Sequence, residues 1–270
     1  MSDDPLKKLI AAIRASQNYG AVSQTLIESV GLSELNKRSS LKEAIKSTKN
    51  KLHQVGGAYL DQSLPYGQWI DKLRAVQGDS SRVQALCLEY MEKHASTRER
   101  LPILETFYPT LFHLLPPIRR IIDLACGLNP LALPWMPLPA GASYRAYDIY
   151  GDMTDFAGGF IHLWGMDGGG FCRDILNDPP PDEADLTLLL KAIPCLEQIS
   201  KDAGKRLLDS IRSPWLIVSF PITSLGGREK GMRTHYEAHF ETLTAGRGWV
   251  LQKVSFTTEL VFVVRTNDGA

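Results

Sequence analysis

The stretch Ile121-Ile122-Asp123-Leu124-Ala125-Cys126-Gly127-Leu128-Asn129-Pro130 decides how the second half of this chain folds. Its apolar start is typical of a buried strand, and Gly127 then indicates a tight turn where backbone can approach a ligand. An acid, Asp148, stands at the end of the next apolar run. A carboxylate in that place can accept hydrogen bonds from ribose hydroxyls. The pattern therefore predicts a nucleoside-binding α/β unit.

The turn lacks the G-x-G-x-x-G fingerprint of dinucleotide-binding domains, which argues against an NAD-dependent oxidoreductase. The spacing Asp123-x-x-x-Gly127 instead resembles motif I of S-adenosylmethionine (SAM) methyltransferases. A buried strand that merely ends in a turn is the alternative interpretation of this motif taken alone.

Apolar runs alternate with helical or loop segments through the second half of the chain. They cover 119–125, 143–148, 170–174, 185–191, 215–220, 249–256 and 259–265. This alternation predicts a parallel sheet with helices on its faces. Only a short turn at Thr257 and Thr258 separates the last two runs, so they must pair as an antiparallel hairpin. Seven strands that end in such a hairpin resemble the Rossmann-like sheet of class I SAM-dependent methyltransferases. The glycine-rich segment 165–170 is expected to be a loop before the third strand.

The first 95 residues show the spacing of amphipathic helices. Apolar positions three or four apart predict helices over 5–14, 21–31, 40–55, 68–77 and 80–95, and no convincing strand. We therefore expect an all-helical domain over 1–95 and a SAM-binding domain over 96–270, in an α/β protein.

The net charge is zero, but the charges are unevenly distributed. Residues 1–100 contain 15 Lys or Arg and 11 Asp or Glu, so the remainder carries the opposite excess. The densest basic run has a single acid, Glu43, among Lys37, Arg38, Lys42, Lys46, Lys49 and Lys51. Such a run favours an anionic partner such as RNA, although a solvated helix face is an equally good interpretation.

Several classes of protein are disfavoured by composition. The four cysteines form no C-x-x-C pair, which predicts neither a metal site nor a disulfide framework. We expect all four to be buried in a reduced, cytoplasmic protein. No apolar run approaches the ~20 residues of a membrane span, and the start lacks the features of a secretory signal. We expect no DNA or membrane partner and a monomer.

SAM requires a backbone turn beside its methionine part, donors for its carboxylate, an acid for its ribose and a polar group for its adenine. Ala125 and Gly127 are candidates for the turn, and Asp148 for the ribose acid. Asp174 ends the third apolar run, where it could meet the adenine amino group or simply cap a helix. The segment His94–Arg100 could hold the carboxylate, or be an exposed helix start. Lys191, at the end of the fourth run, is either at the methyl-transfer site or a surface lysine.

A polar loop follows the fifth apolar run. Residues 219–232 include glycines and two cations, Arg228 and Lys230, a combination that suits a loop ordered against phosphates. A solvated connector is the alternative.

Longer motifs resemble one family. They are His94-Ala-Ser-Thr-Arg-Glu-Arg-Leu101, Asp123-Leu-Ala-Cys-Gly-Leu-Asn-Pro-Leu-Ala-Leu133, Ser224-Leu-Gly-Gly-Arg-Glu-Lys-Gly-Met232 and Leu52-His-Gln-Val-Gly-Gly-Ala-Tyr59. They resemble the aminoglycoside-resistance 16S ribosomal RNA methyltransferases, the Arm/Rmt enzymes and their relatives in antibiotic producers. The resemblance implies methylation of N7 of guanine-1405 in the assembled 30S ribosomal subunit. The segment 150–170 departs from the family pattern.

The resemblance also implies roles for individual residues. SAM would be surrounded by Tyr59, His94, Ala95, Ser96, Arg100, Ala125, Gly127, Asp148, Ile149, Asp174, Ile175, Leu190 and Lys191. The RNA would be held by Lys37, Arg38, Lys42, Lys46, Lys49, Arg228 and Lys230.

Guanine N7 already carries a lone pair, so we expect no essential general base and only a possible positioning role for Lys191. Two other functions remain open: an RNA-binding ribosome assembly factor with an inactive methyltransferase fold, and methylation of a neighbouring nucleotide, such as an adenine N1.

Overall fold

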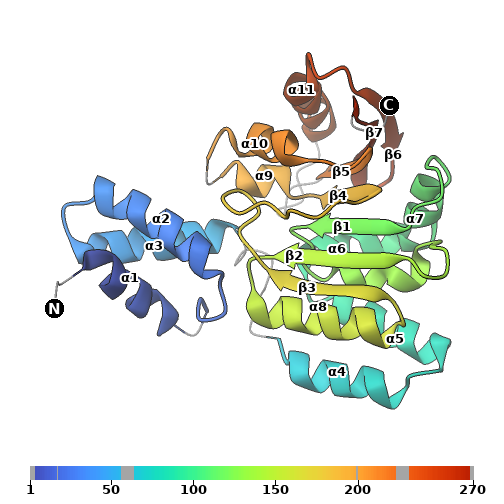
Figure 1. Cartoon of the computed structure of the whole chain (residues 1–270), viewed down its shortest axis with the longest axis horizontal. Helices are drawn as coiled ribbons and strands as arrows, with labels where there is room; N and C mark the ends of the chain where they lie inside the picture. Colours follow the sequence, from blue (N-terminus) through green and yellow to red (C-terminus); the bar gives the residue numbers. More distant parts are fainter. Residues whose placement is uncertain (1–3, 17, 56–63, 199, 223–230, 268–270) are drawn as a thin grey trace.

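The computed structural model describes residues 4–16, 18–55, 64–198, 200–222 and 231–267. In the described part of the first 95 residues the helices are α1 (Pro5–Arg14), α2 (Gln24–Lys37), α3 (Leu41–Val55), α4 (Tyr66–Ala75) and α5 (Ser80–Met91). Figure 1 shows α1, α2 and α3 standing together to one side of the sheet, and we call these three helices the amino-terminal lobe. In contrast, α4 packs against α8 (Gly151–Leu163), a helix that covers the sheet.

Capping and apolar spacing explain how the lobe begins. Asp4 accepts a hydrogen bond from the backbone N–H of Leu6, and Pro5 occupies the first turn of α1, where its missing N–H is not needed. Leu9 and Ile13, one turn apart on α1, are both fully buried. The helix therefore presents one apolar face to α2 and α3.

The sheet has seven strands in the order β3-β2-β1-β4-β5-β7-β6. Their bounds are β1 (Arg120–Leu124), β2 (Ser143–Asp148), β3 (Asp167–Cys172), β4 (Leu186–Leu190), β5 (Trp215–Pro221), β6 (Val250–Ser255) and β7 (Glu259–Arg265). Strands β1 to β5 pair in parallel, whereas β7 pairs antiparallel with both β5 and β6. The predicted hairpin is confirmed, and the fold is that of class I SAM-dependent methyltransferases.

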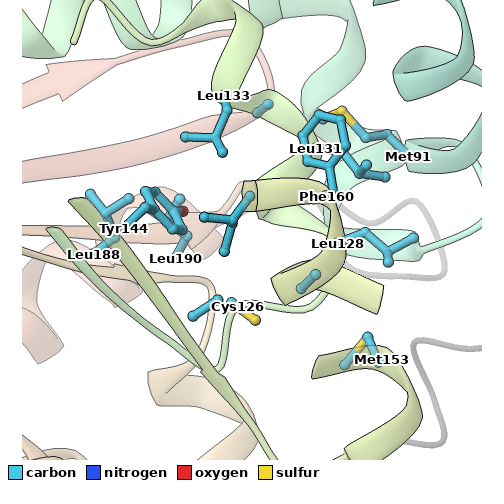
Figure 2. Close-up of a cluster of buried hydrophobic side chains, with 14 of the residues drawn as sticks. Met91, Cys126, Leu128, Leu131, Leu133, Tyr144, Met153, Phe160, Leu188 and Leu190 are labelled. Atoms are coloured by element: carbon cyan, nitrogen blue, oxygen red, sulfur yellow. The ribbon is translucent and has the colours of Figure 1, made fainter. Parts of the chain in front are cut away.

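Helices cover both faces of the sheet. Among the described residues the remaining helices are α6 (Ala95–Arg100), η2 (Leu101–Ile103), α7 (Leu104–Phe112), η3 (Asn129–Trp135), α9 (Ile193–Leu196), α10 (Ala203–Ser210) and α11 (Met232–Thr244). Figure 2 shows one core, in which Tyr144 of β2 lies beside Leu188 and Leu190 of β4. A second core, on the other face, contains Phe220, Phe240 and Phe262. The central strands β1, β4, β5 and β7 therefore have two buried faces, which explains their nearly continuous apolar runs, whereas the edge strands β3 and β6 are largely exposed or half-buried.

Most of the glycine-rich segment 165–170 is strand rather than the expected loop, because β3 begins at Asp167 and only residues 165–166 precede it. A Cβ added to Gly170 would lie 1.8 Å from the carbonyl oxygen of Thr154, and one added to Gly158 would lie 2.7 Å from the backbone nitrogen of Gly170. The glycines thus let α8 approach the strand backbone directly. Without side chains at 168–170 the sequence has no alternation to mark a strand, which explains the error.

The cysteines differ from expectation in one case. Cys87, Cys126 and Cys195 are buried, but Cys172, at the end of the edge strand β3, is exposed. Within the described residues, no group of three His, Cys, Asp or Glu side chains is arranged to hold a metal ion. No helix in that part of the chain has the length and apolar character needed to cross a membrane.

Candidate functional site

A cleft of about 800 Å³ opens at the carboxyl ends of the parallel strands. It lies where the strand order changes direction between β1 and β4, the place where open α/β sheets bind ligands. The turns after these strands supply most of its wall, and helices α2, α6, α8 and α9 complete it. Of the predicted cofactor residues, the cleft is lined by His94, Ser96, Ala125, Gly127, Asp148, Ile149, Asp174, Ile175, Leu190 and Lys191.

The turn after β1 has an unusual backbone. Ala125 and Gly127 have φ angles of +54° and +52°. In the described residues, positive φ at a non-glycine position occurs only at Ala125 and Lys191, and both line the cleft. Such conformations cost free energy and are concentrated at functional sites. Because Ala125 has a small side chain and Gly127 has none, a ligand in the cleft has room to approach the backbone of this turn.

Asp148, the last residue of β2, is tied to this turn. Its Oδ2 accepts a hydrogen bond from the backbone N–H of Gly127 at 2.9 Å, and its Oδ1 accepts one from Ile149 at 2.7 Å. Burial raises the pKa of the Asp148 carboxyl, while these backbone donors oppose the rise. The carboxylate is thereby fixed at the rim of the cleft, in a position to accept further hydrogen bonds.

Asp174 lies two residues beyond β3 and is 2% exposed. Its Oδ1 accepts a hydrogen bond from the backbone N–H of Leu176 at 3.1 Å, and its Oδ2 accepts one from the Asn177 side chain at 2.7 Å. Asp174 therefore does cap a local turn, but it also lines the cleft. The structural and the ligand-binding interpretations are compatible at this residue.

His94 precedes α6 and forms a wall of the cleft above the glycine turn. A Cβ added to Gly127 would lie 2.8 Å from Cε1 of the His94 ring, so only glycine leaves room for it. Burial lowers the pKa of His94 to about 4, helped by the nearby cations Lys191 and Arg100. The ring is therefore neutral at pH 7.

The low pKa of His94 predicts a pH-dependent stability. In the unfolded chain histidine binds a proton near pH 6.5, whereas the folded ring stays neutral until about pH 4. The neutral His94 ring therefore makes its full contribution to the free energy of unfolding above pH 6.5. This contribution, about 3 kcal/mol, is lost as the pH falls toward 4. Urea denaturation between pH 7.5 and 4.5 should show this slope, and His94→Gln should reduce it. The same substitution at the exposed His113 serves as the control, and an unchanged slope in His94→Gln would contradict the assignment.

Lys191, directly after β4, is buried rather than a surface lysine. Its Nζ lies 3.1 Å from the carbonyl oxygen of Ser96, 2.8 Å from Glu99 Oε2 and 3.2 Å from Glu259 Oε1. An ammonium group has three N–H donors, so these three acceptors satisfy it. Lys191 thus joins β4 to the segment that carries His94 and Ser96.

Arg100 does not line the cleft, contrary to its expected contact with the cofactor. It is fully buried, and its Nε and Nη2 donate to the two carboxylate oxygens of Glu259 at 2.8 and 3.1 Å. Its Nη1 donates to Asn129 Oδ1 at 2.9 Å. The guanidinium group therefore has a structural role outside the cleft, since its donors already bond to Glu259 and Asn129. Ala95, also buried, likewise lies outside the lining.

The motif acid Asp123 belongs to the same buried network. Its Oδ2 accepts hydrogen bonds from Tyr144 Oη at 2.6 Å and from Asn129 Nδ2 at 2.9 Å. Burial raises the pKa of Asp123 to about 6, against the opposing effect of these donors and of Arg100. Asp123 does not line the cleft, and through Asn129 it is linked to Arg100 and so to Glu259.

Comparison with known proteins identifies the family. The chain matches the ribosomal RNA methyltransferases of the FmrO family over residues 15–263. This chain belongs to that family. It is 39% identical over 258 residues to the 16S rRNA (guanine(1405)-N(7))-methyltransferase of Frankia casuarinae, which covers 94% of this chain and 91% of the relative. The enzyme of the same name from Serratia marcescens is 33% identical over 258 residues, and the match covers 96% of this chain and 97% of that enzyme.

Solved structures agree with this membership. The 16S rRNA methylase RmtB superposes with a TM-score of 0.79 and 28% identity, covering 97% of this chain and 98% of its own. The structure of RmtF, solved with S-adenosyl-L-homocysteine, has a TM-score of 0.79 and 29% identity, and the match covers 99% of this chain and 100% of RmtF. The recognition of the family from its motifs is confirmed.

The basic run of this FmrO-family chain lies mainly on α3. Lys42, Lys46 and Lys49 are spaced by four and three residues, so they share one helix face. Other cations of the run serve the lobe itself. Arg38 Nε and Lys51 Nζ lie 3.1 and 2.7 Å from the fully buried carboxylate of Glu34. Lys37 Nζ donates to Ser33 Oγ at 3.0 Å.

Some lining residues were missed by the sequence reasoning. They are Leu26, Cys126, Tyr150, Met153, Arg173, Ala192, Cys195 and Leu196. Cys126, Tyr150, Arg173 and Ala192 adjoin a predicted residue and could have been found by extending each strand end by a turn. Leu26, Met153, Cys195 and Leu196 lie on helices, and no local signal marks them. Tyr59, Arg228 and Lys230 fall outside the described residues.

Proposed function

We propose that this chain is a SAM-dependent methyltransferase that methylates N7 of guanine-1405 of 16S rRNA in the assembled small ribosomal subunit. The observation that carries the proposal is a cleft with two acids, Asp148 and Asp174, at the strand ends of a chain that belongs to the FmrO family. Relatives that match nearly its full length bear the name of this activity. The enzyme would act in the cytoplasm, as a monomer.

The donors and acceptors of the cleft suit SAM. Asp148 can accept hydrogen bonds from ribose hydroxyls, and Asp174 can accept from the adenine amino group. Apolar side chains, including Ile149, Ile175 and Leu190, offer surfaces for the adenine ring. Backbone at Ala125–Gly127 and the Ser96 side chain would face the methionine part.

SAM supplies an electrophilic methyl group, and the chain has to bring the guanine to it. Guanine N7 needs no proton removed before it attacks, so positioning is the main requirement. Lys191 would contribute by holding Ser96 and β4 in place, because its ammonium group already has three acceptors. The guanine has to leave its stack, at a cost of a few kcal/mol that contacts in the complex must offset.

The helical residues 1–95 would bind the rRNA and residues 96–270 would bind SAM. The Lys42, Lys46 and Lys49 face of α3 supports this division, since a row of cations can track a phosphate backbone. Lys37, Arg38, Arg228 and Lys230 would add to the same interaction.

Charge reversal on α3 should weaken binding to the small subunit. Replacing Lys46 and Lys49 by Glu should lower the affinity roughly tenfold or more, and reduce the slope of log K against log salt by about 2. Filter binding at several salt concentrations measures both. The charge-matched control is Arg119→Glu with Arg265→Glu, two exposed arginines at the amino ends of the parallel strands, the end opposite the cleft. Equal salt slopes in all three proteins would contradict the proposed role of α3.

The proposal is tested by expressing the chain in a susceptible bacterium and measuring resistance. Resistance to 4,6-disubstituted deoxystreptamine aminoglycosides, with sensitivity to 4,5-disubstituted ones, is the expected pattern. Sensitivity to both classes despite soluble expression would refute it. An assembly factor with an inactive fold would also fail to bind S-adenosylhomocysteine in calorimetry.

A further inference from the structure

Helix α2 of the amino-terminal lobe reaches into the cleft. Leu26, in its first turn, is 2% exposed and lines the cleft together with Tyr150 and Met153. Nearly all of the other lining residues come from the turns after the strands or from helices packed on the sheet. Leu26 is therefore a contact from the lobe to whatever occupies the cleft.

A backbone clip holds the lobe at this place. Val22 and Tyr150 form an antiparallel bridge. The backbone N–H of Ser23 donates to the carbonyl of Ile149 at 2.7 Å, and that of Gly151 donates to the carbonyl of Ala21 at 2.8 Å. Ile149 follows the ribose acid Asp148 directly. The segment that would contact the ribose is thus also the segment that carries the lobe.

The second acid of the cleft is connected to the lobe as well. Asn177 Nδ2 lies 3.2 Å from Ser29 Oγ on α2 and 2.7 Å from Asp174 Oδ2. One amide group therefore joins α2 to the carboxylate that would bind the adenine. Asp174 is thus joined to the lobe through the Asn177 side chain, and Asp148 is joined to it through the backbone of its neighbour Ile149.

We propose that Leu26 contacts the cofactor and that cofactor and rRNA bind with positive coupling through the amino-terminal lobe. A ligand that touches Leu26 and both acids stabilises one placement of the lobe on the sheet domain. The Lys42, Lys46 and Lys49 face moves with the lobe, so the same placement presents it to the RNA. This inference rests on the proposed function, in which the lobe binds rRNA. Coupling is reciprocal, so the bound subunit also raises the affinity for the cofactor.

Calorimetry with S-adenosylhomocysteine tests the contact. Leu26→Ala should raise the Kd about tenfold, since the apolar contact is lost. The matched control is Leu32→Ala on the same helix, because Leu32 is 47% exposed and its loss should leave Kd within twofold. A folded Leu26→Ala protein with the wild-type Kd would overturn the contact. If Leu26→Ala does not fold, hydrogen exchange of the wild-type chain decides: S-adenosylhomocysteine should protect amides 23–30, and unchanged exchange there would overturn it.

The coupling is tested by binding to 30S subunits with and without S-adenosylhomocysteine. Wild-type affinity should rise at least fivefold with the ligand, within the usual range of coupling. Ser23→Pro removes the N–H that bonds to Ile149 at a φ of −47°, close to that of proline, and should abolish most of this rise. Gln24→Pro, at the first position of α2, is the control and should keep it.

Failure of the coupling and failure of the proposed function are distinguishable. If the wild-type chain methylates subunits but binds them equally with and without S-adenosylhomocysteine, the coupling is refuted and the function stands. If it neither binds nor methylates subunits, the proposed function itself is wrong.

Discussion

Replacing Glu259 by Gln should lower the free energy of unfolding by about 3–5 kcal/mol, because it leaves two buried cations without their shared anion. Glu259 is fully buried and contacts both Arg100 and Lys191. For a chain of this size the loss corresponds to a fall in Tm of about 10 °C. Urea denaturation and thermal scanning at pH 7.5 measure it.

A surface glutamate provides the matched control. Glu183 lies 3.8 Å from Arg120, and its side chain is 85% exposed. Glu183→Gln should change the stability by less than about 0.5 kcal/mol, since exposed pairs contribute little. If Glu259→Gln changed the stability as little as Glu183→Gln does, the ion pairs of Glu259 would not stabilise the fold.

The effect of Glu259→Gln should depend on pH in a defined direction. Burial alone would raise the pKa of Glu259, but Arg100 and Lys191 outweigh it and the net pKa is lowered. A carboxyl with a lowered folded pKa stabilises the protein above its unfolded pKa, near 4.3, and loses that contribution as the pH falls through the folded pKa. The difference in the free energy of unfolding between wild type and Glu259→Gln should therefore be largest at neutral pH and should shrink in strong acid.

Gly127→Ala should weaken S-adenosylhomocysteine binding by about 100-fold, or about 2.7 kcal/mol. The new Cβ would lie 2.8 Å from the ring of His94, which is itself a wall of the cleft. The ring has to move, and the backbone at φ +52° adds about 1 kcal/mol of strain. Calorimetry measures the affinity directly.

Gly141→Ala separates strain from the clash. Gly141 has φ +75°, and a Cβ there would meet nothing within 4 Å. This variant should lose about 1 kcal/mol of stability and bind S-adenosylhomocysteine normally. If Gly127→Ala binds as well as Gly141→Ala does, the contact between His94 and Gly127 is not needed for the site.

The sequence predicted those parts of the site that depend on local chain order. A glycine turn after a strand and an acid after the next one must meet at the same sheet edge, because parallel strands share their carboxyl ends. Asp148 and Asp174 were placed correctly in the cleft on this argument. The terminal hairpin followed from a connection too short for a parallel crossover.

Other features depend on contacts between distant segments. Arg100 is 159 residues from its partner Glu259, and no spacing rule could show that its charge is used there rather than in the cleft. Leu26 is an ordinary apolar residue of an amphipathic helix, so its place in the cleft follows only from the packing of the lobe. The strand at 167–172 was misread because glycines carry no pattern, although they allow α8 to pack on it.

The most direct test of the account is to incubate small ribosomal subunits with the purified chain and SAM, and to map the modified nucleotide. Primer extension after borohydride and aniline treatment detects N7-methylguanosine as a strand break. We predict a break at guanine-1405 that requires both SAM and the intact chain and is lost in Asp174→Ala. A stop at another nucleotide, including one at an adenine without chemical cleavage, or no modification by a chain that binds SAM, would contradict the account.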